Sequence, residues 1–264
     1  GAIFAGVNSA DIKVFGVGGG GSNAVNHMHK QGINGVDFVV CNTDLQSLGT
    51  SSVSTKLQIG ANLTEGRGAG NSPEIGRNAA LENVEEIREL LSENTKMVFI
   101  TAGMGGGTGT GAAPIIAQIA KELDILTVGI VTTPFSFEGG KRKSQAEKGI
   151  DEMRKYVDSL IIINNDKVRE YYGNLKLSEA FCKADDILTV AAKGISELIT
   201  IPGYMNVDFE DVKAIMKNSG VAIMGTGIAE GEDRAQKAVE MALNSPLLDD
   251  NEIYGARNVL LFIS

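Results

Sequence analysis

Short apolar runs alternate with amphipathic segments along the first two thirds of the chain. Five runs rich in β-branched residues predict buried strands, at Ile12 to Val17, Val36 to Asn42, Met97 to Ala102, Ile125 to Thr132 and Leu160 to Asn164. Segments with helical spacing lie between them, at Ala24 to Gln31, Pro73 to Leu91, Ala112 to Leu123 and Lys143 to Tyr156. This alternation predicts an α/β fold with a mostly parallel sheet covered on both faces, whose ligands bind at the carboxyl ends of the strands.

A longer helical pattern follows, from Ser178 to Thr200, and Ile201-Pro202-Gly203 ends it. At ~1.5 Å per residue such a helix spans about 35 Å, enough to cross a domain. The later residues predict two further helices and two strands, at Phe209 to Lys217, Asp233 to Leu243, Val221 to Ile228 and Asn258 to Ile263. We interpret residues 1–177 as one domain, 178–201 as a central helix and 202–264 as a smaller α+β domain. We expect this last domain to be incomplete, because the sequence ends within the apolar run VLLFIS.

Composition and charge narrow the classes of function. The formal net charge is -9 without a basic stripe or tail, which argues against nucleic-acid binding and binding to anionic membranes. Cys41 and Cys182 cannot form a disulfide framework and fit a reducing cytosol. No apolar run approaches the ~20 residues that a membrane span needs, and the initial GAIFAG lacks the features of a signal peptide. The sequence therefore predicts a cytoplasmic protein that does not insert into membranes.

The first of two glycine clusters, GVGGGGSN at 16–23, directly follows a predicted strand and precedes a helix. Glycine lets the backbone approach a phosphate closely, and a helix N-terminus supplies unpaired N–H groups. We therefore expect nucleotide contacts from Gly19, Gly20, Gly21, Ser22 and Asn23. Two alternatives remain for this cluster alone. It could be a plain strand-to-helix turn, or it could be the pyrophosphate loop of a dinucleotide site, with Asp44 as its ribose-binding acid.

The second glycine cluster, GMGGGTGTG at 103–111, also follows a predicted strand and opens a helix. A dinucleotide site needs one such loop, whereas two loops at strand ends suit a triphosphate gripped by backbone N–H groups from two sides. The cluster contains no lysine, so it is not a Walker A loop. A flexible linker is the alternative, which the flanking strand and helix argue against. Expected contacts here are Gly105, Gly106, Gly107 and Thr108.

These clusters and several other motifs resemble the tubulin/FtsZ family of GTPases. GGGTGTG at 105–111 is the tubulin-type signature, and the family's other motifs follow in order: GVGGGGSNAV at 16–25, CNTD at 41–44, GRGAG at 66–70, PFSFEGGKR at 134–142, NNDK at 164–167 and NVDFEDV at 206–212. The resemblance runs from about Asp11 to the last residue. It implies a tubulin-like fold, with a nucleotide-binding domain, a long central helix and a smaller activation domain.

The resemblance also implies how the rest of the nucleotide is bound. Glu138 and Arg142 would contact the ribose and phosphate region, although their spacing alone fits an i,i+4 surface ion pair. Phe181 would stack on the base, where spacing alone equally allows a core aromatic. Asn165 and Asp186 would contact guanine; a carboxylate that accepts from N1 and the exocyclic amine rejects adenine. The choice of Asp186 over its neighbour Asp185 rests on the resemblance.

The two histidines, His27 and His29, have no accompanying cysteine or acidic ligand spacing, so we expect no protein-held metal site. His27 is expected at the surface, although it could edge the nucleotide. Mg²⁺ is expected to be held mainly by the phosphates of GTP or GDP and by water.

Hydrolysis needs a positioned water, and the candidates to position it are Asn206, Asp208 and Asp211. They lie one helix length beyond the glycine clusters. The resemblance implies that they act on the nucleotide of the next subunit in a head-to-tail filament, so that assembly switches on hydrolysis. Helix capping is the alternative, since Asp208 is a good N-cap and an acid three residues later favours the helix dipole.

Three functions from different classes follow from these motifs. The first is a polymerising GTPase of the bacterial division ring, located at mid-cell, whose partners are further copies of itself and membrane-tethering and regulatory proteins. The second is a nicotinamide-dependent oxidoreductase, and the third is a nucleotide-binding filament protein with little catalysis. The resemblance favours the first. Because the family has further strands and a tail beyond this sequence, we expect this form to keep its nucleotide pocket but to assemble poorly.

Overall fold

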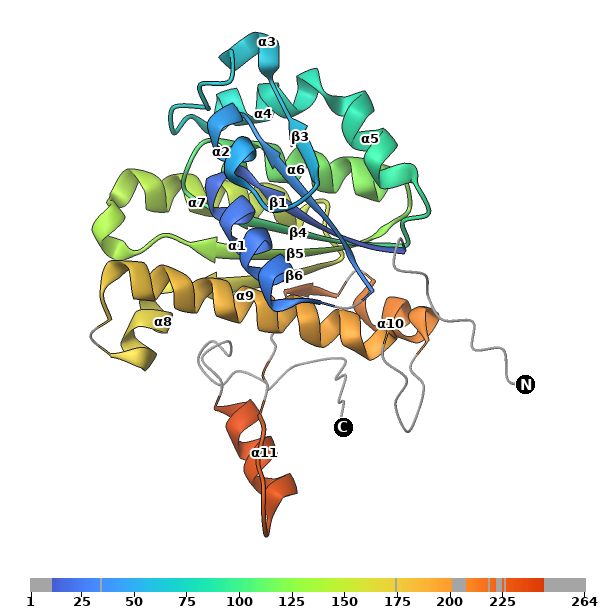
Figure 1. Ribbon diagram of the computed structural model, residues 1–264, viewed down its shortest axis with the longest axis vertical. Coiled ribbons are helices and arrows are strands. Elements are labelled where there is room, and N and C mark those ends of the chain that lie inside the picture. Colours follow the sequence, from blue (N-terminus) through green and yellow to red (C-terminus); the bar gives the residue numbers. More distant parts are fainter. Residues whose placement is uncertain are drawn as a thin grey trace.

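A parallel sheet forms the centre of the computed structural model, which describes residues 11–33, 35–173, 175–200, 208–217, 219–221, 225 and 227–244 (Figure 1). Within these residues the sheet has seven strands in the order β3-β2-β1-β4-β5-β6-β7. Their bounds are β1 (Ile12–Val17), β2 (Asp37–Asn42), β3 (Thr55–Gln58), β4 (Met97–Gly103), β5 (Leu126–Thr133), β6 (Ser159–Asn164) and β7 (Gly220–Val221). All six pairings are parallel, which confirms the predicted α/β class.

Helices cover both faces of the sheet, because successive strand residues point to opposite sides. In β1, for example, Val14 belongs to one hydrophobic cluster and Phe15 to the other. The first cluster includes residues of α1 (Gly18–Gln31), α9 (Leu177–Thr200) and α10 (Phe209–Met216). The second includes residues of α4 (Pro73–Glu82), α5 (Val84–Ser92), α6 (Thr108–Glu122) and α7 (Gly140–Arg154). The remaining helices are α2 (Leu45–Thr50), α3 (Ala61–Thr64), the short η2 (Ser136–Glu138), α8 (Asn165–Tyr172) and α11 (Arg234–Leu243).

The prediction of a single helix from Pro73 to Leu91 is wrong in one respect. The helix is broken at Asn83 into α4 and α5. The Asn83 side chain bonds elsewhere: its Oδ1 accepts from the backbone N–H of Gly60 at 2.8 Å, and its Nδ2 donates to Glu86. Asparagine favours such local bonds over a continuous helix. The elements β3, α2, α3 and α8 were not predicted, and α1 and α6 begin earlier than predicted, because both helices start inside the glycine clusters.

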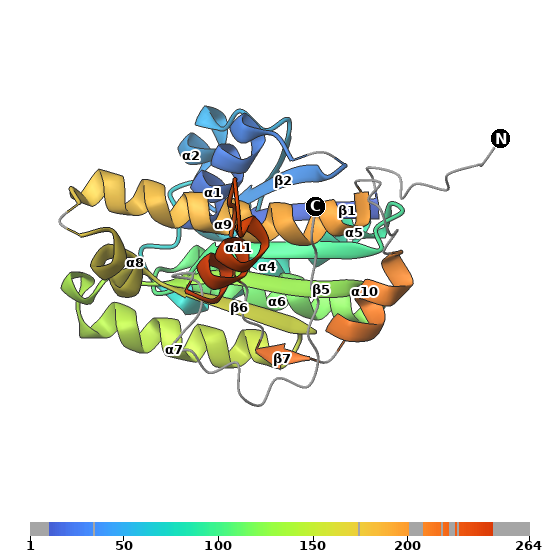
Figure 2. The same cartoon turned by 90° about the horizontal axis from the view of Figure 1, so that it is seen from below.

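The long helix is confirmed as α9 and crosses the sheet, with α8 near one end and α10 near the other (Figure 2). The helix predicted after it is confirmed as α10. Strand β7 then pairs with β6, Ser159 opposite Gly220 and Leu160 opposite Val221. Strand β7 thus adds to the same sheet, and the predicted division at 177, 201 and 202 stays a prediction. The strand predicted from Val221 to Ile228 is only partly matched: Val221 lies in β7, residues 225, 227 and 228 are not in a strand, and residues 222–224 and 226 lie outside the described residues. The strand predicted at 258–263 also lies outside the described residues, and the smaller domain at 202–264 stays a prediction.

The two cysteines differ in their surroundings. Cys41 is buried in β2, Cys182 is exposed on α9, and both are free thiols. Burial raises the pKa of Cys41 to about 12, so this thiol stays protonated. In the part of the chain that the structure describes, no helix combines the length and apolarity of a membrane span.

Candidate functional site

The two glycine clusters lie against each other at one edge of the sheet. The first cluster begins at the end of β1 and the second at the end of the neighbouring strand β4. The two strand ends lie side by side, because Gly16 of β1 is paired with Thr101 of β4. A Cβ on Gly18 would lie 2.8 Å from the backbone N of Gly109, and one on Gly21 would lie 2.4 Å from the carbonyl O of Thr101. Real side chains cannot occupy such positions, so the clusters are glycine-rich because their backbones touch.

The second cluster also packs against the segment that leads into α4. A Cβ on Gly107 would meet the backbone N of Ser72 at 2.8 Å, and one on Gly111 would meet the carbonyl O of Pro73 at 1.9 Å. A buried hydrogen bond of 2.7 Å joins the hydroxyl of Thr108 to that of Thr43, which follows β2. The loops after three adjacent strands therefore converge at this edge.

Two glycines in these clusters differ from the others, because Gly19 and Gly106 have nothing within 4 Å of the Cβ position. Each cluster thus keeps one position with open space in front of it, beside positions that are closed by backbone. Among the described residues, no side chain other than those of the chain neighbours comes within 4 Å of either position.

The helices that begin here, α1 and α6, have no side-chain cap and no acidic residue in the first turn. By contrast, the first turns of α2, α4 and α10 are capped by the side chains of Asp44, Ser72 and Asp208. Uncapped N–H groups at a helix N-terminus carry partial positive charge and bind anions. Two such termini that open on the same edge of the sheet suit a ligand with several phosphates.

Two predicted site residues carry buried polar atoms without a partner among the described residues. These atoms are Oγ of Ser22, in α1, and Oδ1 of Asn165, at the start of α8. Both residues are more than nine-tenths buried. An unsatisfied buried polar group costs about 1–3 kcal/mol, so both atoms suit hydrogen bonds to a ligand. Thr101 Oγ1, which no sequence motif indicated, is also unpaired among the described residues. Asn23, by contrast, is exposed.

Glu138 and Arg142 form the i,i+4 ion pair that their spacing allows, with 3.4 Å between Oε1 and Nη1. Glu138 Oε2 also accepts from the backbone N–H of Phe135 at 2.7 Å, and Arg142 Nη2 donates to Asn71 Oδ1 at 3.0 Å. Arg142 therefore connects α7 to the loop before α4, beside Gly105, whose Cβ position lies 3.0 Å from the Arg142 carbonyl O.

Phe181 is not a core aromatic, because 42% of it is exposed. Its ring meets Phe135 at 89° with 5.0 Å between centroids, and Phe135 in turn stacks on Phe137. Edge contacts of this kind stabilise a ring and fix its direction. Phe181 is thus held at the start of α9 with part of its surface free for a ligand.

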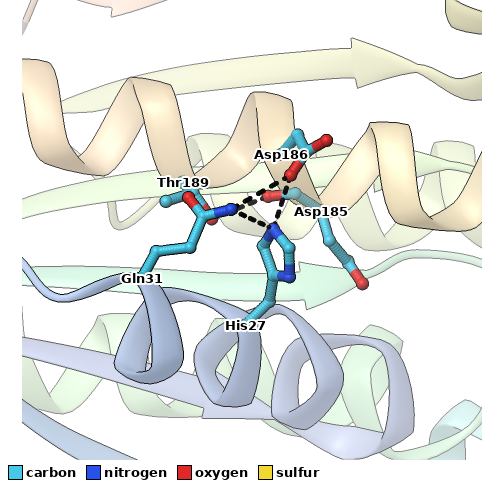
Figure 3. Close-up of polar contacts among 5 residues, drawn as sticks. All are labelled: His27, Gln31, Asp185, Asp186 and Thr189. Atoms are coloured by element: carbon cyan, nitrogen blue, oxygen red, sulfur yellow. Dashed lines mark hydrogen bonds and ion pairs between the residues drawn. The ribbon is translucent and has the colours of Figure 1, made fainter.

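Asp186 lies on α9 and faces α1, where two side chains donate to it (Figure 3). Its Oδ1 is 2.6 Å from Nε2 of His27 and 3.3 Å from Nε2 of Gln31. His27, expected at the surface, is only partly exposed and lies between the two helices. Neither contact was visible in the sequence, because 159 positions separate His27 from Asp186.

Asp185, next to Asp186, has a pKa raised to about 6. Burial is the main cause, the charge of Asp186 adds to it, and His27 opposes it. The Asp185 carbonyl O also accepts from Thr189 Oγ1 at 2.8 Å within α9.

Asp208 and Asp211 form a capping box at the start of α10. Asp208 Oδ1 accepts from the backbone N–H of Asp211 at 2.9 Å, and Asp211 Oδ2 accepts from that of Asp208 at 3.4 Å. The capping interpretation is therefore confirmed. Both residues are exposed. Helix α10, which they cap, lies near the end of α9 opposite α8 (Figure 2), so the chain does not bring them together with the glycine clusters. Asn206 lies outside the described residues.

Three further features bear on other possible sites. Asp44 Oδ1 accepts from the backbone N–H of Ser47 at 3.0 Å, so the carboxylate that a dinucleotide site would need caps α2 instead. The described residues contain no group of three or more His, Cys, Asp or Glu that could hold a metal ion. A groove of about 280 Å³ beside Phe38 and His29 holds none of the predicted site residues.

Comparisons with known sequences match nearly the whole chain. The profile of the Tubulin/FtsZ family, GTPase domain, matches residues 11–173, and that of the FtsZ family, C-terminal domain, matches residues 220–264. The cell division protein FtsZ of Buchnera aphidicola is 56% identical over 258 residues, which are 97% of this chain and 67% of that protein. The FtsZ of Pseudomonas aeruginosa is 54% identical over 97% of this chain and 65% of its own length. The chain thus spans about two thirds of these relatives.

Solved structures agree with this match. The FtsZ dimer of M. jannaschii, described as empty, is 47% identical and has a TM-score of 0.86 over 90% of this chain and 69% of that chain. CetZ2 of Haloferax volcanii, described as a GTPgS bound protofilament, has a TM-score of 0.75 over 89% of this chain and 71% of that chain. Its identity of 21% supports a common fold alone.

Proposed function

Because the chain belongs to the tubulin/FtsZ family of GTPases, we propose that it binds and hydrolyses GTP and assembles head to tail into filaments of the bacterial division ring. The observation that carries this proposal is the meeting of the two glycine clusters. Two uncapped helix N-termini and two open glycine positions lie at one edge of the sheet. This arrangement presents backbone N–H groups to a triphosphate without a lysine.

The phosphates would be bound by the backbone of Gly19 to Gly21 and Gly105 to Thr108, with Ser22 and Asn23 beside them. The unpaired Oγ of Ser22 supports this placement. Glu138 and Arg142 would contact the ribose and phosphate region from the start of α7. Mg²⁺ would be held mainly by phosphate oxygens and water, and when bound it would neutralise charge on the transferred phosphoryl group.

The base would lie between α8 and α9, where Asn165, Phe181 and Asp186 are found. The exposed ring of Phe181 offers a stacking surface, and the carboxylate of Asp186 accepts hydrogen bonds only. Guanine presents two donors, at N1 and the 2-amino group, whereas adenine presents an acceptor at N1. A bound base would cover this partly exposed carboxylate, and leaving it opposite an acceptor would be costly, so guanine would be preferred.

Hydrolysis would be completed by the next subunit. The exposed Asp208 and Asp211 stand at the far end of α9, whose 24 residues span about 36 Å at ~1.5 Å per residue. In a head-to-tail filament that end would face the glycine clusters of a neighbour, where the two carboxylates, with Asn206, would orient and polarise the attacking water. As a division-ring protein the chain would act in the cytoplasm at mid-cell, together with tethering and regulatory proteins.

Thermal denaturation with added nucleotides and a GTPase assay test this proposal. GTP and GDP should raise the melting temperature, and NAD should not. Phosphate release per molecule should climb with protein concentration, because the active site is shared between subunits. Stabilisation by NAD but not by GTP would contradict the nucleotide assignment, and turnover independent of concentration would contradict the shared site.

A further inference from the structure

We propose that His27 is a positioning residue for guanine recognition, which holds the carboxylate of Asp186 in the orientation that reads the base. This inference rests on the proposed contact between Asp186 and guanine. It adds a residue on α1 to a recognition site otherwise assigned to α8 and α9.

The hydrogen-bonding roles follow from the chemistry of the groups. An ionised carboxylate can only accept, so the 2.6 Å contact requires His27 Nε2 to carry the hydrogen. Nε2 then cannot accept from Gln31, although the Gln31 amide N is 3.0 Å away. Gln31 therefore donates to Asp186 Oδ1, at the longer distance of 3.3 Å. His27 makes the stronger of the two bonds.

Both donors end on the same oxygen of Asp186. Among the described residues nothing is seen to donate to Oδ2, which points away from His27 and Gln31 (Figure 3). The terminal torsion of a free aspartate is broad, so an unsupported carboxylate samples many directions. Held through Oδ1, Asp186 presents Oδ2 in one direction and loses less freedom when a base binds. An incoming donor on Oδ1 would replace the weaker Gln31 bond.

His27 also connects the two ends of the proposed nucleotide site. Helix α1 begins with the first glycine cluster and carries His27 further along on the side that packs against α9, where Met28 and Leu188 share a hydrophobic cluster. The helix that presents phosphate-binding N–H groups therefore also sets the base-reading carboxylate. The competing interpretation is a purely structural clasp between α1 and α9.

Calorimetric titration with GDP and IDP separates these two roles. IDP lacks the 2-amino group, so it forms one bond fewer to Asp186. In His27→Ala we expect GDP affinity to fall about 10-fold, the equivalent of ~1.4 kcal/mol, and IDP affinity to fall less. His27→Gln places an amide N–H near the position of Nε2 and should restore most of the preference for GDP. His29→Ala, two positions along the same helix and exposed, is the matched control and should bind both nucleotides like the wild type.

A structural clasp gives a different pattern: GDP and IDP affinities fall by the same factor, in step with the melting temperature. That result, or an unchanged GDP-to-IDP ratio in His27→Ala, overturns the inference. Asp186→Asn tests the underlying contact separately, because its amide can donate to the C2 carbonyl of xanthine. This variant should bind GDP more weakly and XDP more tightly than the wild type does. If Asp186→Asn binds GDP like the wild type, the proposed base contact fails and the role of His27 with it.

Discussion

Gly18 and Gly109 lie so close that a methyl group on the first would stand 2.8 Å from the backbone nitrogen of the second. The two residues come from different glycine clusters and from the loops after adjacent strands. Their contact is therefore made by main chain on both sides. It accounts for glycine at this place by packing alone, and it brings the N-termini of α1 and α6 together.

Replacement of Gly18 by alanine should destabilise the fold. Gly18 has φ +74°, in the left-handed region, and the added methyl would clash with backbone that cannot move alone. We expect a loss of about 1–3 kcal/mol in the free energy of unfolding, measured by urea denaturation. Gly49→Ala is the control, since Gly49 is exposed in α2 with nothing within 4 Å of its Cβ position. It should be neutral or stabilising by about 0.5–1 kcal/mol. Equal stabilities of the two variants would show that the contact does not constrain the fold.

Replacement of Asp211 by asparagine should separate catalysis from helix capping. The asparagine side chain keeps an oxygen that can accept from the Asp208 N–H, so α10 and its capping box should remain. The negative charge that would polarise water is lost. We expect GTP affinity within about 2-fold of the wild type and a fall in turnover of about 100-fold, in the range of general-base contributions. Asp211→Ala should also keep GTP binding and lose turnover.

Asp208→Asn is the companion variant for the same two measurements, GTP affinity and turnover. Its cap should remain, because asparagine caps helices as well as aspartate does. Mixing Asp211→Asn with a subunit defective in nucleotide binding would test the shared site further, since each subunit could then supply what the other lacks. Full turnover in Asp211→Asn would leave capping as the function of this carboxylate. Loss of GTP binding together with turnover would contradict a site completed by the neighbour.

Replacement of Asp185 by asparagine should stabilise the protein near neutral pH. The pKa of Asp185 is raised to about 6 in the fold by burial, against about 3.9 in an unfolded chain. Between these values the folded state binds more protons than the unfolded state, so stability due to this group falls as pH rises from about 4 to about 6 and stays low above. At pH 7.5 the variant should gain on the order of 1–3 kcal/mol, a rise of several degrees in melting temperature. The gain should shrink at pH 5.5. A variant less stable than the wild type at both pH values would contradict this account.

Strands β1, β2, β4, β5 and β6 could be predicted to within about one residue, because fully buried parallel strands read as continuous apolar runs. Other features of the fold, such as strand β3 and the break between α4 and α5, could not be predicted. The break at Asn83 depends on a hydrogen bond to Gly60, which is far away in the sequence. Strand β7 has two residues and shares only Val221 with the strand predicted from Val221 to Ile228. Its place in the sheet depends on its pairing with β6, which the sequence does not show.

The candidate site shows the same limit. Local motifs identified the glycine clusters, and they also identified the capping box at Asp208 and Asp211, which the structure confirms as a cap. The different surroundings of the individual glycines could not be predicted, because only the fold shows that Gly19 faces open space while Gly18 touches backbone. The bond from His27 to Asp186 likewise exists only because α1 packs against α9.

The most direct test of the account is the affinity of Gly19→Ala and Gly106→Ala for GTP and GDP, measured by calorimetric titration. Apart from the chain neighbours, no atom of the described residues lies within 4 Å of either Cβ position. Both variants should therefore unfold at the same urea concentration as the wild type. The added methyl groups would occupy the space in front of the uncapped N–H groups, and each variant should bind GTP at least 10-fold more weakly. If both variants bind GTP like the wild type, the phosphates are not held between the glycine clusters and the account is contradicted.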